Sequence, residues 1–332
     1  MERRKAVIIG TGSYLPQKVL SNFDLEKMVE TSDEWITTRT GMKERRIAHK
    51  DEFTSSMGVE AAKSAIASAN ISVEEIDLIL VATITPDYAF PNTACLIQAE
   101  LKATKAAAVD IQAACTGYLY GLSMAKAFIE SGMYNTILLI ASEKLSSIVN
   151  YRDRNTCVLF GDGAAASVIT FQGKGLRIRE TCLGADGEQA SLVNIPAGGS
   201  RQPASMQTVS DELHYLKMEG KELFKHAVRR MEMASKVCID RAGLKEEEIN
   251  WLIPHQANLR IIEALAKRFQ VSMERVYITL QKYGNTSASS VGIALDELVR
   301  EKETKKGENL LLIAFGAGLT WGAGILTVED GS

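Results

Sequence analysis

Uncharged apolar runs alternate with longer amphipathic segments along this chain. Residues 79–84, 137–141 and 310–315 contain no charged residue, which is typical of strands buried on both faces of a sheet. Segments with helical spacing lie between such runs, for example at residues 117–129. Strands that alternate with helices predict an α/β fold in which helices pack on a mostly parallel sheet.

The chain also contains an internal repeat. Residues 69–80 and 242–253 share the pattern of a helix end, an acidic turn and an apolar strand. The run at 137–141 returns at 310–314, and both matches lie 173 residues apart (69 to 242, 137 to 310). Because two distant matches share one offset, we predict a duplicated α/β unit, with an N-terminal half at 1–172 and a C-terminal half at 173–332.

The composition is that of an ordinary globular protein, with 46% apolar and 24% charged residues. A net charge of −3 argues against a protein that binds nucleic acid or a membrane surface through its overall charge. Residues 310–328 are uncharged and approach the length of a membrane span, but four glycines interrupt them. We therefore predict two buried strands around a glycine turn and no membrane segment.

The cysteines are few and scattered. None of them forms a Cys-x-x-Cys pair, which argues against a zinc cluster or a disulfide framework; they are Cys95, Cys115, Cys157, Cys182 and Cys238. No apolar region near the N-terminus is long enough for a signal peptide. Reduced thiols in a cytoplasmic protein are the interpretation that fits best.

Cys115 is the first candidate for chemistry. It follows the strand-like stretch Val109-Asp-Ile111 and precedes the helical pattern at 117–129. Backbone N–H groups and the helix dipole at such a junction favour a thiolate, so we expect a lowered pKa of this thiol. The alternative is a small buried cysteine with no chemical role.

His255 and Asn285 are the other candidates. His255 follows a buried strand in Trp251-Leu-Ile-Pro-His255, and Asn285 precedes small residues that open a helix running toward Glu301. Each also has a structural interpretation. His255 is compatible with a hydrogen-bonded core histidine, and Asn285 with a helix N-cap or a turn residue.

Two glycine motifs are weaker signals. Gly10-Thr-Gly-Ser-Tyr-Leu15 begins like a dinucleotide-binding motif but has Leu in place of the third Gly, so we expect no nicotinamide cofactor. Gly161-Asp-Gly163 indicates a tight turn after a strand predicted at 156–160.

Several motifs occur in order along nearly the whole chain: Thr31-Ser-Asp-Glu-Trp-Ile36, Arg39-Thr-Gly-Met-Lys-Glu-Arg-Arg46, Ala113-Ala-Cys115-Thr-Gly117, Phe160-Gly-Asp-Gly163, Pro254-His255-Gln-Ala-Asn258, Gly284-Asn285-Thr-Ser287 and Phe315-Gly-Ala-Gly318-Leu-Thr-Trp321. This set resembles the β-ketoacyl–acyl carrier protein synthase III family, whose members start fatty-acid synthesis. The resemblance implies a thiolase-like fold, with duplicated α/β halves, layered helices and two mixed, mostly parallel sheets.

The resemblance also implies a reaction and its catalytic residues. Cys115 is expected to take an acyl group from acyl-CoA, with acetyl-CoA as the expected primer, and His255 and Asn285 to stabilise the enolate left when malonyl–acyl carrier protein loses CO2. The backbone N–H groups of Cys115 and Gly316 are expected to hold the oxyanion. The products are 3-oxoacyl–acyl carrier protein, CO2 and CoA. No metal or other cofactor is implied, since acyl-CoA is a substrate.

Binding residues follow from the same resemblance. The positions expected to contact CoA are Thr31, Trp35, Arg39, Arg154, Phe224 and Asn258. Those expected to dock the acidic acyl carrier protein are Lys225, Arg260, Lys267 and Arg268. Phe90 and Phe315 are expected at the acyl pocket, with Phe90 reaching across a homodimer into the partner's pocket.

Other functions remain open at this point. A related acyltransferase of secondary metabolism would use CoA thioesters alone, and a non-catalytic binding subunit could share the fold. A biosynthetic thiolase is disfavoured because residues 309–332 contain no second cysteine. A hydroxymethylglutaryl-CoA synthase needs a carboxylate base, and we expect none near the strand end at residues 82–83.

Overall fold

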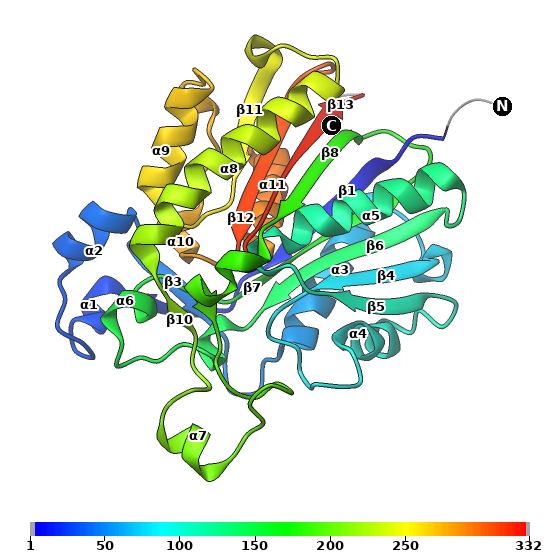
Figure 1. The fold of residues 1–332 in the computed structure, drawn as a ribbon. Coiled ribbons are helices and arrows are strands. Elements are labelled where there is room, and N and C mark those ends of the chain that lie inside the picture. The colour runs from blue at the N-terminus through cyan, green and yellow to red at the C-terminus, as the bar shows by residue number, and fades with distance from the viewer. Residues whose placement is uncertain (1–3, 330–332) are drawn as a thin grey trace.

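The computed structural model describes residues 4–329, in which nine strands form one continuous mixed sheet (Figure 1). From one edge to the other, the strands are β11 (Ile249–Pro254), β12 (Asn309–Gly316), β13 (Thr320–Val328), β8 (Leu176–Ala185), β1 (Val7–Tyr14), β7 (Gly163–Thr170), β6 (Thr136–Glu143), β4 (Leu78–Ala82) and β5 (Ala107–Ile111). Two small ribbons pair β2 (Lys18–Ser21) with β3 (Glu44–Ile47), and β9 (Val193–Asn194) with β10 (Lys217–Met218).

Helices cover this sheet. The longer ones are α3 (Thr54–Ala69), α4 (Thr93–Leu101), α5 (Gly117–Ser131), α8 (Gly220–Arg241), α9 (Leu259–Arg268) and α11 (Ser289–Glu301). The shorter ones are α1 (Asn22–Leu25), α2 (Asp33–Thr40), α6 (Arg154–Cys157), α7 (Met206–Ser210) and α10 (Leu280–Tyr283). The α/β class predicted from the alternating pattern is confirmed.

The sheet is parallel only toward its two ends. β11–β12, β6–β4 and β4–β5 are parallel, whereas the five pairings between β12 and β6 are antiparallel. Short connections such as the turn from β12 to β13 permit only antiparallel neighbours, because a parallel pair needs a long crossover. The two sheets that we expected are joined into one, since β1 pairs with β8 at two positions, Val7 with Arg177 and Ile8 with Leu176.

The strand order is mirrored about the junction of β8 and β1. β1, β7, β6 and β4 follow one another on one side, and β8, β13, β12 and β11 follow in the corresponding order on the other. β6 and β12 begin 173 residues apart, at residues 136 and 309. The predicted boundary at 172/173 falls in the turn between β7 and β8, and the division into two domains stays a prediction. The ends of these halves, residues 1–3 and 330–332, lie outside the described residues.

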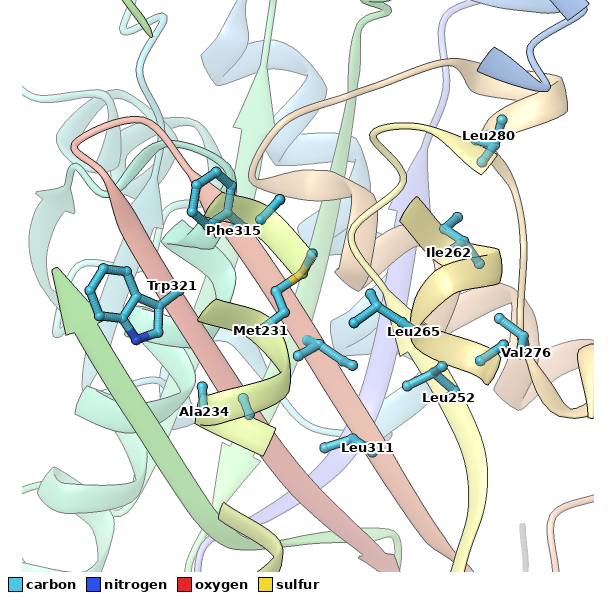
Figure 2. Packing of buried hydrophobic residues seen from close by; sticks show 14 of the residues in the cluster. Met231, Ala234, Leu252, Ile262, Leu265, Val276, Leu280, Leu311, Phe315 and Trp321 are labelled. Carbon is cyan, nitrogen blue, oxygen red and sulfur yellow. The ribbon is translucent and has the colours of Figure 1, made fainter. Parts of the chain in front are cut away.

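Three apolar cores hold the layers together. α3 and α4 pack on the β4–β6–β7 face of the N-terminal half. α5 and α11 pack against each other and against strands from both halves, so they form the middle layer. α8 and α9 cover the C-terminal strands, where Met231, Leu265 and Leu311 meet (Figure 2).

Two local predictions can be compared directly with the structure. The uncharged stretch 310–328 does form two buried strands, β12 and β13, and no helix within residues 4–329 is long and apolar enough to cross a membrane. The strand predicted at 156–160 is wrong. The short helix α6 occupies its first part, because Asp153 caps the N-terminus by accepting hydrogen bonds from Asn155 N and Thr156 Oγ1.

The Gly10-Thr-Gly motif has a packing role in this structure. A Cβ at Gly10 would lie 2.5 Å from the backbone nitrogen of Ala69 and 2.6 Å from the carbonyl oxygen of Ala65. Helix α3 therefore lies directly on the backbone of β1, and any side chain at this position would push the two elements apart.

We predict that Gly10→Ala destabilises the protein. Overpacking against the α3 backbone costs about 1–3 kcal/mol, which lowers the Tm by roughly 2–10 °C in a chain of this size. Thermal unfolding followed by circular dichroism measures the shift. Gly187→Ala is the control, because a Cβ at exposed Gly187 would have nothing within 4 Å and should leave the Tm unchanged. Equal Tm values for the two variants would contradict the packing argument.

Candidate active site

Three segments from distant parts of the chain meet beyond the ends of strands of the sheet. Cys115 lies in a single 3-10 turn, Ala114–Thr116, between β5 and α5. His255 directly follows β11, and Asn285 lies between α10 and α11. Strand ends in α/β sheets are where reactive groups usually gather.

The backbone of Gly316 lies against Cys115. A Cβ at Gly316, the last residue of β12, would lie 2.8 Å from the nitrogen and 3.2 Å from the Cβ of Cys115. Thr116 ties the same turn to β13, since its hydroxyl lies 2.6 Å from the Ala113 carbonyl and 2.7 Å from Thr320 Oγ1. Only a glycine at 316 permits this approach of strand to turn.

The segment at residues 285–290 links the cysteine to the histidine. The Ser287 hydroxyl acts on the Cys115 thiol by lowering its pKa against the effect of burial, and Ser290 Oγ lies 2.6 Å from Nδ1 of His255. The Asn285 side chain belongs to the same turn, because its Oδ1 accepts the Ser287 N–H at 2.8 Å. The structure therefore brings Cys115, His255 and Asn285 to one place.

His255 is buried and uncharged. Only 5% of its surface is exposed, and this burial lowers the pKa of the imidazole to about 4. Its backbone N–H donates to the Ile313 carbonyl at 2.7 Å, which fixes the residue beside β12. A serine hydroxyl that donates to Nδ1 leaves the proton of the neutral ring on Nε2. Within residues 4–329, neither His255 Nε2 nor Asn285 Nδ2 has a hydrogen-bond partner, so both nitrogen atoms are free to bind a ligand.

The state of Cys115 differs from our expectation. We expected a lowered pKa at the helix N-terminus, but burial raises the pKa of the thiol to about 12. The Ser287 hydroxyl works against this shift, whereas the negative charge of Glu143 adds to it. At pH 7 the unliganded protein therefore holds a thiol, and the proton must leave during any nucleophilic attack.

Glu143 is the residue that the sequence analysis missed. It is fully buried at the end of β6, and its Oε1 accepts the Ser287 hydroxyl at 3.0 Å. Its Oε2 accepts from Thr83 Oγ1 at 3.2 Å and from Ile84 N at 3.0 Å. We expected no carboxylate near residues 82–83, and this expectation is wrong. Strand β6 pairs with β4 and brings the carboxylate of Glu143 to that strand end, although the two are far apart in the sequence. The sequence did contain a signal for this residue, because Glu143 is a single acidic residue at the end of an uncharged, mostly apolar run.

The predicted CoA contacts are only partly clustered. The guanidinium carbons of Arg39 and Arg154 lie 4.7 and 4.9 Å from the Trp35 ring centroid, and the neighbouring Thr31 Oγ1 is buried without a hydrogen-bond partner among the described residues. A purine between Trp35 and Arg154 would need about 7 Å, twice a carbon–carbon contact distance. Arg154 must therefore move before a purine can stack between these two side chains.

The two remaining predicted CoA contacts lie on other elements. Asn258 caps α9 through Arg260 N at 2.9 Å and donates to the Arg39 carbonyl at 3.1 Å. Phe224 lies on α8 with 40% of its surface exposed.

The predicted carrier-protein residues lie on α8 and α9, which pack together. Lys225 pairs with Glu222 at 2.7 Å, and Arg268 pairs with Glu232 at 2.7 Å. Arg260 Nη2 donates to the Thr38 carbonyl at 3.3 Å. Lys267 is exposed near the end of α9. Much of the positive charge on this face is therefore already engaged within the chain.

The two predicted acyl-pocket residues do not meet within one chain. Phe315 is buried on β12 next to Gly316 and faces the core beneath α8 (Figure 2). Phe90 is 87% exposed in the loop before α4.

Comparisons with known proteins agree with this architecture. The family model described as 3-oxoacyl-[acyl-carrier-protein (ACP)] synthase III matches residues 109–187, and its C-terminal counterpart matches residues 239–328. The chain is 62% identical to the β-ketoacyl-[acyl-carrier-protein] synthase III of Chlamydia muridarum over 97% of its own length and 99% of that protein. It is 55% identical to the protein of the same name from Caldanaerobacter subterraneus, over 98% of each chain.

Solved structures give the same result. The crystal structure of 3-oxoacyl-[acyl-carrier-protein] synthase III from Aquifex aeolicus superimposes with a TM-score of 0.90 at 50% identity, covering 97% of this chain and 99% of that one. The priming β-ketosynthase of the R1128 polyketide pathway superimposes with a TM-score of 0.91 at 36% identity, covering 100% of this chain and 98% of that one. The expected thiolase-like condensing-enzyme fold is confirmed.

We predict that His255 stays neutral down to about pH 5. Because burial depresses its pKa to about 4, the ring should gain a proton only as the pH falls toward 4. NMR of the protein labelled with 13C in the histidine rings measures this titration, and His255→Ala identifies the signal. A midpoint near 6.5 would contradict an imidazole held out of water.

Proposed function

This chain belongs to the 3-oxoacyl-[acyl-carrier-protein] synthase III family, and we propose that Cys115, His255 and Asn285 carry out the family's reaction in it. The reaction is the initiating condensation of fatty acid synthesis. An acyl group passes from acyl-CoA to the enzyme and is then joined to malonyl–acyl carrier protein with loss of CO2. The observation that carries the assignment is the segment 285–290, which hydrogen-bonds His255 through Ser290 and places Ser287 where it influences the Cys115 thiol.

In the first half-reaction, Cys115 attacks the thioester carbonyl of the primer. The sulfur forms a new thioester, and CoA leaves. The developing oxyanion would lie between the N–H of Cys115 and that of Gly316, whose backbones are in contact. Backbone donors that are already in place stabilise the charge without reorganisation.

In the second half-reaction, malonyl–acyl carrier protein loses CO2 and leaves an enolate. Nε2 of His255 and Nδ2 of Asn285 have no hydrogen-bond partner among the described residues, so as N–H donors they can hold the enolate oxygen. Each donor of this kind is typically worth about 3 kcal/mol in the transition state. A neutral imidazole suits this role, because it donates a hydrogen bond without keeping a net charge in the buried site. The carbanion then attacks the acyl group on Cys115, and the chemistry requires no cofactor.

Two groups of side chains are suited to bind the substrates. Trp35 with Arg39 and Arg154 offers flat cationic and aromatic surfaces for the adenine of CoA. Lys267 is the exposed positive charge best suited to the acidic carrier protein, with Lys225, Arg260 and Arg268 reachable after exchange of their present partners.

We further propose a cytoplasmic homodimer. Phe90 exposes 87% of its surface, which fits a side chain that enters the partner's acyl pocket. All five cysteines are free thiols, which fits a reducing compartment.

A priming synthase of secondary metabolism is the second candidate. It is supported by the 36% identity to the polyketide priming β-ketosynthase, which shares the fold over the full length. The higher identity to the β-ketoacyl-[acyl-carrier-protein] synthase III of Chlamydia muridarum, 62%, favours the first candidate. Assays with malonyl–acyl carrier protein and with malonyl-CoA separate enzymes that need the carrier from those that do not.

We predict that the wild-type protein converts acetyl-CoA and malonyl–acyl carrier protein to 3-oxobutyryl–acyl carrier protein, and that Cys115→Ser abolishes this product. A serine alkoxide is not available near pH 7, so the acyl-enzyme should not form. Mass spectrometry of the carrier protein measures the product, and a panel of longer and branched acyl-CoA primers defines the preferred one. A Cys115→Ser variant that transfers acyl groups at the wild-type rate would refute the nucleophile.

We predict that His255→Ala lowers malonyl decarboxylation about 100-fold, as loss of one oxyanion donor typically does. Acylation of Cys115 by acetyl-CoA should stay within threefold of the wild-type rate, since the proposed role of His255 is to stabilise the enolate of the second substrate only. CO2 release measures the first step, and the mass shift of the intact protein measures the second. Equal losses in both steps would contradict this division of roles.

A further inference from the structure

Glu143 is a buried acid that forms no ion pair with any residue between 4 and 329. The groups that face it are the hydroxyls of Thr83, Thr85 and Ser287 and the N–H of Ile84. The adjacent Lys144 does not face it, because its Nζ donates to the carbonyls of His49 and Glu52. A carboxylate held in this way by neutral donors keeps its position but gains little compensation for its lost hydration.

Ser287 stands between this acid and the reactive sulfur. Its Oγ donates to Glu143 Oε1 at 3.0 Å, and the same hydroxyl is near enough to the Cys115 thiol to lower its pKa. Its backbone has a φ of 51°, in the left-handed region that disfavours side chains, and the Asn285 amide oxygen holds its N–H at 2.8 Å. The surrounding contacts thus keep the hydroxyl aimed at both groups.

The first half-reaction needs a proton acceptor at this place. Cys115 is a thiol at neutral pH and must lose its proton as the sulfur attacks. His255 is a poor acceptor, because its pKa is only about 4. Burial raises the pKa of Glu143 to about 7, which is near the value that suits a general base at neutral pH.

We propose that Ser287 and Glu143 form a proton relay that takes the thiol proton of Cys115 during acylation and returns it during condensation. This inference rests on the proposed function, since it requires an acyl-enzyme at Cys115. Ser287 contacts the reacting sulfur, and Glu143 acts through Ser287.

In the first step, each proton and each electron pair has a defined destination. The Cys115 proton passes to Ser287 Oγ while the serine proton passes to Glu143 Oε1, and the sulfur electron pair forms the bond to the acyl carbon. The carbon–sulfur bond to CoA then breaks, and CoA leaves with the electron pair and takes a proton from solvent.

The second step reverses the transfer. The carbanion attacks the acyl group, the bond between that group and Cys115 breaks, and Cys115 leaves with the electron pair. The proton stored on Glu143 returns through Ser287 to the sulfur. One solvent proton is consumed for each turnover, which matches the overall reaction.

If the relay operates, the pH dependence of the acylation rate should follow the ionisation of Glu143. The side chains that hydrogen-bond this carboxyl come from the loop after β4 and from the segment 285–290, and none of them titrates. Cys115 is the titratable group that interacts with it. The single-turnover rate of acylation should therefore rise with pH through about 7, as Glu143 loses its proton.

The test compares Glu143→Gln, Ser287→Ala and the double variant in single-turnover acylation by acetyl-CoA, followed by the mass of the intact protein. We expect each single variant to acylate about 100-fold more slowly than the wild type at pH 7.5 and to lose the limb near pH 7. The double variant should be no slower than either single variant, because a relay broken at one point is already broken. Additive losses, or an unchanged pH profile in Glu143→Gln, would overturn the relay.

Controls separate the relay from a structural role and from the proposed function. Glu297→Gln alters another buried acid, which accepts from Tyr283 and Lys282, and should keep the wild-type rate and pH profile. Malonyl decarboxylation without primer depends on His255 and Asn285 and should stay within threefold in Glu143→Gln. Parallel losses of acylation and decarboxylation would show a structural role and overturn the relay.

Ser287→Ala leaves the acid in place and provides the second test if Glu143→Gln does not fold. A wild-type protein that forms no acyl-enzyme would overturn the proposed function and the relay together. A wild-type protein that acylates normally, with variants that acylate equally fast, would overturn the relay alone.

Discussion

The segment at residues 285–290 is the constraint on which the site depends, because it is bonded to both halves of the sheet. The Asn285 N–H donates to the Leu159 carbonyl, and its own carbonyl accepts from Gly161, so the segment is tied to the N-terminal half. Ser290 ties it to His255 in the C-terminal half. Without this segment, only strand β12, which lies against Cys115 at Gly316 and accepts the His255 N–H at Ile313, would relate the sulfur to the imidazole.

Close backbone approach is what lets these elements meet. Gly316 brings β12 against Cys115, and a Cβ at Gly117 would lie 2.9 Å from the Cβ of Ala82 and 3.2 Å from that of Ala288. Small residues at such points allow strand ends, the cysteine turn and the segment 285–290 to pack at the density of a protein interior. The same packing excludes water, and it is the loss of hydration that shifts the pKa values of Cys115 and His255.

Burial therefore gives the site its chemical character. A neutral imidazole with a free N–H, a thiol that holds its proton and an acid with a raised pKa are three consequences of one dry environment. In water the cysteine would ionise more easily and the acid would be a weaker base. Burial of apolar side chains in the three large cores stabilises the fold and offsets the free energy lost when these polar groups are desolvated. The cores bury entire strands such as β6 and β12.

Much of the fold was predictable from local pattern, and the exceptions have identifiable causes. The buried strands at residues 79–84, 137–141 and 310–315 and the helix after Cys115 were predicted because hydrophobic period is a local property. The strand predicted at 156–160 failed because a single capping residue, Asp153, outweighed a short apolar run. The junction of the two sheets through β1 and β8 could not be predicted, since it depends on only two residue pairs between distant strands.

The sequence by itself determined which reactive side chains the protein has and in what order its elements follow, because motifs and periodicity are read over a few neighbouring residues. Only the tertiary structure decided their protonation and their partners. Glu143, Ser287 and Cys115 come from three separate parts of the chain, and the hydrogen bonds between them and their loss of hydration exist only after the layers pack. The electrostatic state of a buried group is a property of everything that surrounds it, and no local stretch of sequence contains that information.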